Sequence, residues 1–189
     1  MTALASEGTT VFLEHRLLHD TTGNVPEAPF ETPIGKAAVR RKGRDITIVA
    51  TSAMNAAVRT AVHICARNGI DAEWIDIRSV KPWDRTTVVS SVQKTHRLLT
   101  VDTGHSAFGI GAEILAAISE HLGGKLKKAR RIGLPDLPIP AGPAIERQYY
   151  LGIGDIIYAA AAMCGVRRLM HEAPHGQDNC PQVEYRSAF

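Results

Sequence analysis

Residues 45–80 read DITIVATSAMNAAVRTAVHICARNGIDAEWIDIRSV, and this stretch decides the fold class. It begins with an apolar, β-branched run over Asp45–Ala50, which predicts a buried strand. A helix is then expected over Ala53–Asn68, with apolar residues at helical spacing and Ser52 as its cap. The stretch ends in a second strand over Ala72–Val80. A strand, a helix and a strand in this order indicate a right-handed crossover between parallel strands.

The same alternation continues to residue 164. Further elements are expected as a helix over Arg85–Lys94, a strand over Leu98–Asp102, a helix over residues 110–121, a strand over Ala129–Ile132 and a helix over Asp155–Cys164. The short, charged segment Lys36–Arg41 is expected to form an edge strand. Alternating strands and helices build a sheet that is covered on both faces. The predicted fold class is therefore α/β, a three-layer α/β/α sandwich with a mostly parallel five-stranded sheet and one antiparallel edge strand.

Three regions of different character divide the chain. Residues 1–33 form an amino-terminal arm and linker, in which Thr9–Leu13 (TTVFL) has the composition of one strand and the rest is rich in Pro, Gly, Thr and acids. A lone strand needs partners, so we expect this arm to be the remnant of a missing domain or to dock on another subunit, with Phe12 in the contact. Residues 34–165 form the α/β domain. Residues 166–189 lose periodicity and are expected to form a flexible tail.

The composition is that of one ordinary globular domain plus tails. The chain has 189 residues, of which 44% are hydrophobic and 22% are charged, and a net charge of +3. This mild charge predicts binding to neither nucleic acid nor membranes, and no apolar run approaches the roughly 18 residues that span a bilayer. The beginning of the chain lacks the pattern of a signal peptide. Three cysteines without metal-ligand spacing favour a reducing cytoplasm and predict no metal site.

The turn after the strand Leu98–Asp102 contains the best candidates for chemistry, because ligands in this fold class gather at the carboxyl ends of strands. Gly109 and Gly111 open the next helix, yet Ile114 stands where a dinucleotide-binding motif has its third glycine, and a phosphate-binding loop would end in Gly-Lys-Ser/Thr. Close packing of the helix on the sheet explains these glycines better. His105 in the same turn is a candidate general base, a subunit contact or a structural residue.

A homodimeric contact is also expected at this turn. Glycines permit two chains to approach closely, and an exposed Phe108 would leave an aromatic ring in water unless a partner covers it. We therefore assign His105, Phe108, Gly109 and Gly111 to a subunit interface, as we assign Phe12 of the arm.

Two groups of charged residues have two interpretations each. Asp76 and Arg78, near the end of a central strand, indicate either a subunit interface or a local ion pair. The basic run over residues 123–131 (GGKLKKARR) concentrates five cations, Lys125, Lys127, Lys128, Arg130 and Arg131. A solvated surface is the default for such a run, and a docking site for an acidic partner is the alternative. We assign the run, with Asp136 beyond it, to partner docking.

The order of these segments resembles the β subunit of the thiamine-diphosphate-dependent first component of 2-oxo acid dehydrogenase complexes (pyruvate, branched-chain and acetoin types). The resemblance covers about residues 9–165. It is carried by VFLEHRLL (Val11–Leu18), VPEAPF (Val25–Phe30), PIGKAAVRRKGRDITIVATS (Pro33–Ser52), IDIRSVKPWD (Ile75–Asp84), LLTVDTGHSAFGIGAEI (Leu98–Ile114) and GLPDLPIP (Gly133–Pro140). Transketolase and deoxyxylulose-phosphate synthase share the same carboxy-terminal domain more distantly.

The resemblance implies a function that this chain shares with other subunits. In the family, an amino-terminal domain binds the aminopyrimidine of the cofactor and carries the active-site histidine, and residues 1–33 match only its last strand. The resemblance therefore implies no catalytic or cofactor-binding residue here, with thiamine diphosphate and magnesium carried by other subunits. We expect a stand-alone carboxy-terminal-domain subunit of a split enzyme that decarboxylates a 2-oxo acid or transfers a two-carbon unit to a lipoyl or acyl-carrier partner. The alternative is a non-catalytic scaffold, a dimerisation module or a gene remnant.

Three departures from the family pattern bear on the partner. Thr103 stands where family members commonly have an acidic residue, and Gly124–Lys127 (GKLK) replaces a loop that often carries an acid facing the basic binding domain of the acyltransferase. A further 24 residues follow Gly165, where the family chain usually ends. Docking to a basic domain would bring like charges together, so the sequence favours an acidic partner such as an acyl-carrier protein.

Overall fold

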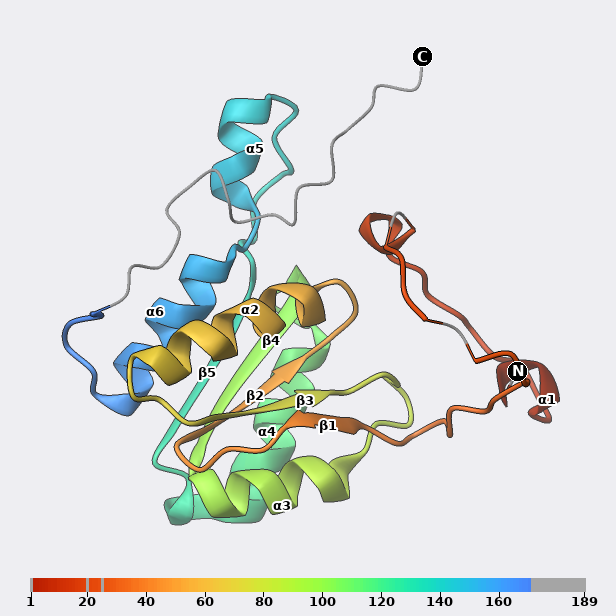
Figure 1. Cartoon of the computed structure of the whole chain (residues 1–189), viewed down its shortest axis with the longest axis horizontal. Coiled ribbons are helices and arrows are strands. Elements are labelled where there is room, and N and C mark those ends of the chain that lie inside the picture. Colours follow the sequence, from red (N-terminus) through yellow and green to blue (C-terminus); the bar gives the residue numbers. More distant parts are fainter. Residues whose placement is uncertain (1, 20, 25, 171–189) are drawn as a thin grey trace.

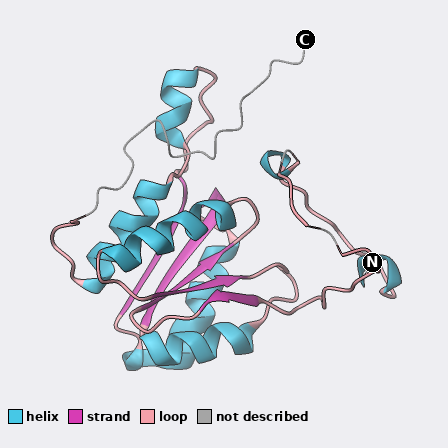
Figure 2. Cartoon of the chain, viewed as in Figure 1, coloured by secondary structure: helices cyan, strands magenta, loops and turns pink. Residues whose placement is uncertain are grey.

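A five-stranded sheet lies at the centre of the computed structural model, which describes residues 2–19, 21–24 and 26–170 (Figure 1). Helices lie on both faces of the sheet (Figure 2). Of the predicted tail, residues 171–189 lie outside the described residues. In the described part of the chain, none of the helices has the length and apolar character needed to span a bilayer.

The strands confirm the predicted fold class. They are β1 (Ala38–Arg41), β2 (Ile46–Ala50), β3 (Ala72–Asp76), β4 (Arg97–His105) and β5 (Lys128–Leu134). Their order in the sheet is β1-β3-β2-β4-β5. β1 runs antiparallel to β3 at one edge, and the other neighbouring pairs are parallel. The sheet is therefore mostly parallel with one antiparallel edge strand.

The helices form the two outer layers. α2 (Met54–Arg67) and α6 (Ile153–Cys164) pack on each other and cover one face, whereas α3 (Arg85–Thr95) and α4 (Ile110–Leu122) cover the other. α5 (Pro143–Tyr149) lies beyond the carboxyl end of β5 (Figure 1). The short elements are α1 (Thr2–Ala5) and the 3-10 helices η1 (Arg16–Leu18) and η2 (Gly123–Lys125).

Alternation along β2 explains why its sequence is apolar on both faces. Ile46 and Ile48 belong to the core under α2 and α6, whereas Val49 belongs to the core under α3 and α4. None of the three is more than 1% exposed. Burying an aliphatic side chain of this size contributes about 1.5–3 kcal/mol. A strand with helices over both faces therefore has the continuous apolar run seen in the sequence.

Two local predictions are wrong, and one helix is missed. Ser52 does not cap α2, because it adopts φ +44° and the helix begins after Ala53 without a side-chain cap. β3 ends at Asp76, and Arg78 beyond it adopts φ +56°, which an extended strand cannot contain. α5 lies in a Pro-rich segment that carries no helical pattern. Residues 9–13 form no strand here, so their pairing with another subunit stays a prediction.

The thiols of the described residues are structural. Cys65 on α2 is fully buried, and burial raises its pKa to about 12. Burial also raises the pKa of Cys164 at the end of α6. Both groups stay protonated at neutral pH, so neither is a candidate nucleophile.

The strand order places a topological switch point between β2 and β4. From β2 the chain crosses through α2 to β3, and from β3 it crosses through α3 to β4 on the other side of β2. The carboxyl ends of β2 and β4 are therefore neighbours whose following helices lie on opposite faces. Open α/β sheets bind ligands at such a point, so this edge is the first candidate for a functional site.

Candidate functional site at the carboxyl edge of the sheet

A hydrogen bond joins the two strand ends at the switch point. Thr51 follows β2 and donates through Oγ1 to Asp102 Oδ1 of β4 at 2.7 Å. Its backbone N–H also donates to the carbonyl of Val101 at 3.2 Å. Thr51 is buried and Asp102 is half-buried, so the contact is partly shielded from water. Pattern reasoning missed this pair, because its members are distant in sequence and only strand order brings them together.

A second polar cluster follows β3. Asn55 donates through Nδ2 to Asp76 Oδ1 at 3.1 Å, and its Oδ1 accepts from Trp74 Nε1 at 2.9 Å. Arg40 of β1 completes the cluster with an ion pair to Asp76 Oδ2 at 2.9 Å. Asp76 thus pairs with Arg40 on the neighbouring strand and not with Arg78, which the local-pair interpretation of the sequence required.

Three non-glycine residues with left-handed backbone conformation lie at this same edge. They are Ser52 after β2 (φ +44°), Arg78 after β3 (φ +56°) and Phe108 after β4 (φ +59°). The conformation costs about 1–2 kcal/mol per residue, and it persists where surrounding contacts impose it. Such residues gather at sites where a protein presents side chains to a ligand or partner, so this edge is a candidate site.

The β4–α4 loop (residues 106–109) presents an aromatic ring to solvent. His105 Nδ1 donates to the carbonyl oxygen of Pro135 at 2.9 Å, and the backbone N–H of Ser106 donates to the carbonyl of Leu134, also at 2.9 Å. These bonds fix the loop to the end of β5. Phe108 at its tip is fully exposed. The loop is therefore a fixed support for an apolar side chain that contacts nothing within the domain.

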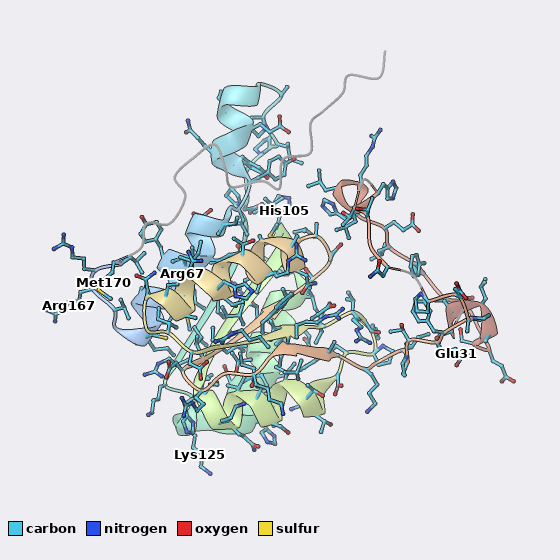
Figure 3. The ribbon with its side chains drawn as sticks, viewed as in Figure 1. Glu31, Arg67, His105, Lys125, Arg167 and Met170 are labelled. Atoms are coloured by element: carbon cyan, nitrogen blue, oxygen red, sulfur yellow. The ribbon has the colours of Figure 1, made fainter. Side chains whose placement is uncertain are left out.

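His105 is oriented by a backbone carbonyl. Because the carbonyl only accepts, Nδ1 carries the proton and Nε2 is the free ring nitrogen of the neutral imidazole. The side chain is exposed at the end of the sheet (Figure 3). The exposed ring is therefore held in one orientation and is available for a surface contact.

The two glycines of α4 serve close packing, as the sequence indicates. A Cβ on Gly111 would lie 2.6 Å from Thr100 Oγ1 of β4, and one on Gly109 would lie 2.6 Å from the carbonyl oxygen of His105. Gly111 is buried, so it lies inside the domain and not at the interface to which the sequence assigned it. Gly109 is half-buried beside Phe108, and its assignment to the subunit interface stays a prediction.

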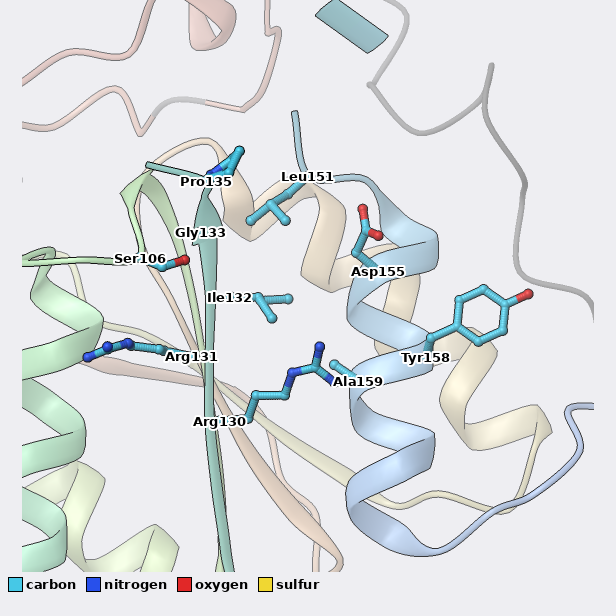
Figure 4. Close-up of a pocket in the computed structure, with 10 residues that line it drawn as sticks. All are labelled: Ser106, Arg130, Arg131, Ile132, Gly133, Pro135, Leu151, Asp155, Tyr158 and Ala159. Atoms are coloured by element: carbon cyan, nitrogen blue, oxygen red, sulfur yellow. The ribbon is translucent and has the colours of Figure 1, made fainter. Parts of the chain in front are cut away.

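The basic run does not form one patch. Lys125 and Lys127 are exposed at the amino end of β5, which Figure 3 shows at the opposite end of the sheet from His105. Arg130 and Arg131 lie along β5, and alternation sends them to opposite faces, toward α6 and α4 respectively (Figure 4). Asp136 follows the carboxyl end of β5, so it lies far from the two lysines of the loop.

Lys128 is tied to the domain. Its Nζ donates to the carbonyl oxygen of Ala162 in the last turn of α6 at 3.0 Å. A cation at a helix carboxyl end is favourable, so this lysine supports the fold.

An open hollow of about 430 Å³ lies on the surface where β5 meets α6 (Figure 4). Ile132, Leu151 and Ala159 give it an apolar wall. Arg130 and Asp155 provide charge at its margin, although Asp155 also accepts from the backbone N–H of Gly152 at the start of α6.

The carboxyl edge does not fit a metal-bound diphosphate. A Cβ on Gly109 would lie 3.0 Å from Asp102 Oδ2, so a carboxylate occupies the start of α4 where a helix would otherwise hold an anion. Within the described ranges, no cluster of three or more His, Cys, Asp or Glu side chains is arranged to hold a metal ion.

Comparison with known proteins gives the family. A model of the transketolase C-terminal domain matches residues 35–156, well over half of the chain. The chain belongs to the transketolase C-terminal domain family. The resemblance seen in the sequence is thereby confirmed at the level of this domain.

The relatives of this transketolase C-terminal domain are longer proteins. The pyruvate dehydrogenase E1 component subunit beta of Pisum sativum is 39% identical over 167 residues, which cover 86% of this chain and 46% of the pea protein. The corresponding subunit of Drosophila melanogaster is 36% identical over 173 residues, with the same coverage of both chains. A solved structure described as a split gene transketolase, inactive β4 tetramer, matches with a TM-score of 0.64 and 28% identity, covering 77% of this chain and 46% of that one. The chain spans about half the length of the curated relatives it matches.

Proposed function

We propose that this chain is the carboxy-terminal-domain part of a thiamine-diphosphate-dependent enzyme of the pyruvate dehydrogenase E1 β or transketolase type. In this proposal another polypeptide supplies the diphosphate- and pyrimidine-binding domains with the cofactor and magnesium. This chain contributes assembly and partner docking, and the assembled enzyme decarboxylates a 2-oxo acid or transfers a two-carbon unit.

The observation that carries the proposal is the family match over residues 35–156. The names of the relatives support it, because they are E1 β subunits and a split-gene transketolase. The form of the carboxyl edge is consistent with this function. Its strained loop presents Phe108 outward and its polar groups bond to one another, as a surface built for assembly would require.

The proposal includes a contact between two copies of the chain at the β4–α4 loop. Phe108 is fully exposed, and the hydrogen bonds of His105 and Ser106 to the end of β5 fix the loop that carries it. A loop that is already fixed loses little backbone freedom on binding, which favours its use as the support of an apolar anchor.

The proposal also includes an acidic lipoyl or acyl-carrier domain that docks at the amino end of β5. Lys125 and Lys127 are exposed there without a carboxylate in the adjacent sequence. Cations at the rim of an interface accelerate encounter with an acidic partner more than they strengthen the final complex.

The test combines this chain with a purified polypeptide that carries the two thiamine-binding domains. Each protein alone and the mixture are titrated with thiamine diphosphate and magnesium by calorimetry, and decarboxylation of pyruvate is followed with an artificial electron acceptor. We expect cofactor-dependent turnover in the mixture, and neither binding nor turnover by this chain alone.

Two results would contradict the proposal. Stoichiometric, magnesium-dependent binding of the cofactor by this chain alone would place the site here. A mixture that forms no complex and shows no turnover with pyruvate or with a ketose phosphate donor would favour a non-catalytic scaffold.

A further inference from the structure

One edge of the sheet is open to a further strand. β5 is the last strand in the sheet order, and within the described ranges its only strand partner is β4. Its first four residues are exposed, Ala129 among them. An edge strand directs alternate backbone N–H and C=O groups away from its sheet. β5 therefore offers backbone hydrogen-bonding groups to a partner.

The hollow beside β5 follows the edge of this strand and does not lie over one face of the sheet. Its lining includes four consecutive residues of β5, from Arg130 to Gly133. Consecutive residues of a strand point to opposite faces, and Figure 4 shows Arg130 and Arg131 on opposite sides of β5. A hollow that is lined by both sets of side chains borders the backbone edge itself. Its volume of about 430 Å³ is thus available next to the outer hydrogen-bonding groups of β5.

The rim of the hollow is polar. Arg131, Asp155 and Tyr158 are exposed there, and Ser106 is half-buried toward the carboxyl end of β5. The apolar lining residues contribute little accessible surface, since Ile132 and Ala159 are buried and form only the inner wall. The hollow is therefore suited to an extended backbone with polar side chains and offers no apolar pocket.

Arg130 and Arg131 carry charge that the domain does not use. Neither guanidinium forms an ion pair in the part of the chain that the structure describes. By contrast, both arginines of the other edge strand, β1, form ion pairs with aspartates of the domain. The carboxylate of Asp155 at the hollow accepts from the backbone N–H of Gly152. Two arginines against one carboxylate leave the hollow positive, which complements an acidic segment.

The same cations argue against a second copy of β5 as the occupant. Two β5 edges placed side by side would bring Arg130 and Arg131 of one copy next to those of the other. Like charges on adjacent strands are destabilising, and natural proteins use charged edge strands to prevent such pairing. An acidic strand would replace this repulsion with attraction.

We propose that β5 accepts an extended acidic segment of a partner protein as a further strand of the sheet. Backbone hydrogen bonds to the outer edge of β5 supply the affinity, and carboxylates of the segment meet Arg130 on one face and Arg131 on the other. This contact requires no cofactor and no thiamine-binding domain. It therefore goes beyond the proposed function and does not depend on it.

The probe is a capped peptide of about six residues in which glutamate and valine alternate, which matches the usual length of a strand. It is titrated into the full chain, and anisotropy of a labelled peptide gives the dissociation constant. Amide exchange with heavy water is followed by NMR for the residues of β5. We expect saturable one-to-one binding, and the outward amides of β5 should exchange at least about tenfold more slowly in the complex because they then donate to the peptide.

Two changes separate backbone pairing from charge. The same peptide with N-methyl groups on its two central residues keeps its charge but loses a donor on each edge, so it should bind about tenfold more weakly or worse. Arg130→Gln with Arg131→Gln should raise the dissociation constant about tenfold or more in low salt, and less near 1 M salt. Arg59→Gln with Arg67→Gln removes two exposed cations of α2 and should change it by less than about twofold.

Several results would overturn the proposal. One is no binding at about 1 mM peptide. Equal binding of the N-methylated peptide would show a contact of charges alone, and equal binding by the Arg130→Gln, Arg131→Gln variant would place the peptide elsewhere. Amides of β5 that already exchange slowly in the free chain, together with concentration-dependent association in sedimentation, would mean that a second copy occupies the edge.

Discussion

Thr51 Oγ1 lies 2.7 Å from Asp102 Oδ1, so a hydroxyl at the end of β2 fixes a carboxylate of β4 beside the loop that presents Phe108. Thr51→Val keeps the shape of the side chain and removes the donor. We expect the free energy of unfolding to fall by about 1–3 kcal/mol, because the half-buried carboxylate loses its partner. Urea unfolding measures the change, and Thr60→Val on the exposed side of α2 is the control. Equal effects of the two variants would show that the bond contributes nothing.

A buried ion pair near the other end of β3 predicts acid sensitivity. Glu73 is 3% exposed and accepts from Lys94 Nζ and from the backbone N–H of Gly43. Burial acts to raise the pKa of Glu73, but the hydrogen bonds from Lys94, Ser91 and Gly43 outweigh it and leave the pKa lowered. A carboxyl with a lowered folded pKa stabilises the protein above its unfolded pKa of about 4.3, and this stability is lost as pH falls through the folded pKa.

Glu73→Gln should therefore destabilise the protein most at neutral pH, by about 1–3 kcal/mol. The difference between the two proteins should shrink as the pH falls below about 4. Denaturant unfolding between pH 3 and pH 7 measures it, and Glu120→Gln on the exposed side of α4 is the control. A difference that stays constant across this range would mean that the charge of Glu73 is not what stabilises the site.

The sequence predicts the layers of this fold well because each buried strand and helix carries its own pattern. Ile46 and Ile48 have the β-branched side chains of a buried strand, and the alternation of strands and helices then leaves few topologies. The wrong predictions concern single residues in the turns between these elements. Ser52 has the side chain of a helix cap but adopts φ +44°, which is imposed by the turn that leads from β2 to α2. The capping preference of a single residue does not decide its conformation where the elements on both sides fix the path of the backbone.

The candidate site is harder to predict because its contacts join distant residues. Asp76 bonds to Arg40 across the antiparallel pair β1–β3, and this pairing depends on a register that no local pattern states. The placement of the basic run on two faces of the sheet could, in contrast, be predicted from the sequence. Arg130 and Arg131 are consecutive residues of a predicted strand, so alternation alone already implies that they face opposite sides.

Gly111 tests the packing of α4 on the sheet. In Gly111→Ala the new Cβ would lie 2.6 Å from Thr100 Oγ1, so the helix must shift. We expect a loss of about 1–3 kcal/mol, despite the higher helix propensity of alanine. Thermal unfolding measures it. Gly124→Ala in η2, where a Cβ meets nothing within 4 Å, should leave the stability unchanged. A stable Gly111→Ala variant would imply that α4 is free to move away from β4.

Phe108 should show a conflict between stability and association. Phe108→Gly relieves the left-handed backbone, so the free energy of unfolding should rise by about 1 kcal/mol. The same change removes the exposed ring, so the proposed homodimeric contact should weaken. His96→Gly is the control, because His96 also has positive φ (+56°) but lies at the end of α3, away from the loop. If Phe108→Gly leaves the dissociation constant of the dimer as it was, the ring is no part of the contact.

The lysines at the amino end of β5 give the last prediction, which concerns the acidic carrier. Lys125→Glu with Lys127→Glu reverses both exposed charges and spares Lys128, whose bond to the carbonyl of Ala162 stabilises α6. Each rim charge contributes on the order of 1 kcal/mol or less, and its main effect is on the rate of encounter. Transfer from the assembled enzyme to the carrier should slow several-fold in low salt. The difference should shrink near 1 M salt, where the Debye length is about 3 Å.

Lys42→Glu, a change of an exposed cation between β1 and β2, is the control and should leave transfer unaffected at every salt concentration. Because unfolding free energy is measured on the same variants, a slower transfer with unchanged stability would assign the effect to docking. Normal transfer by the double variant in low salt would leave the two lysines as a solvated surface.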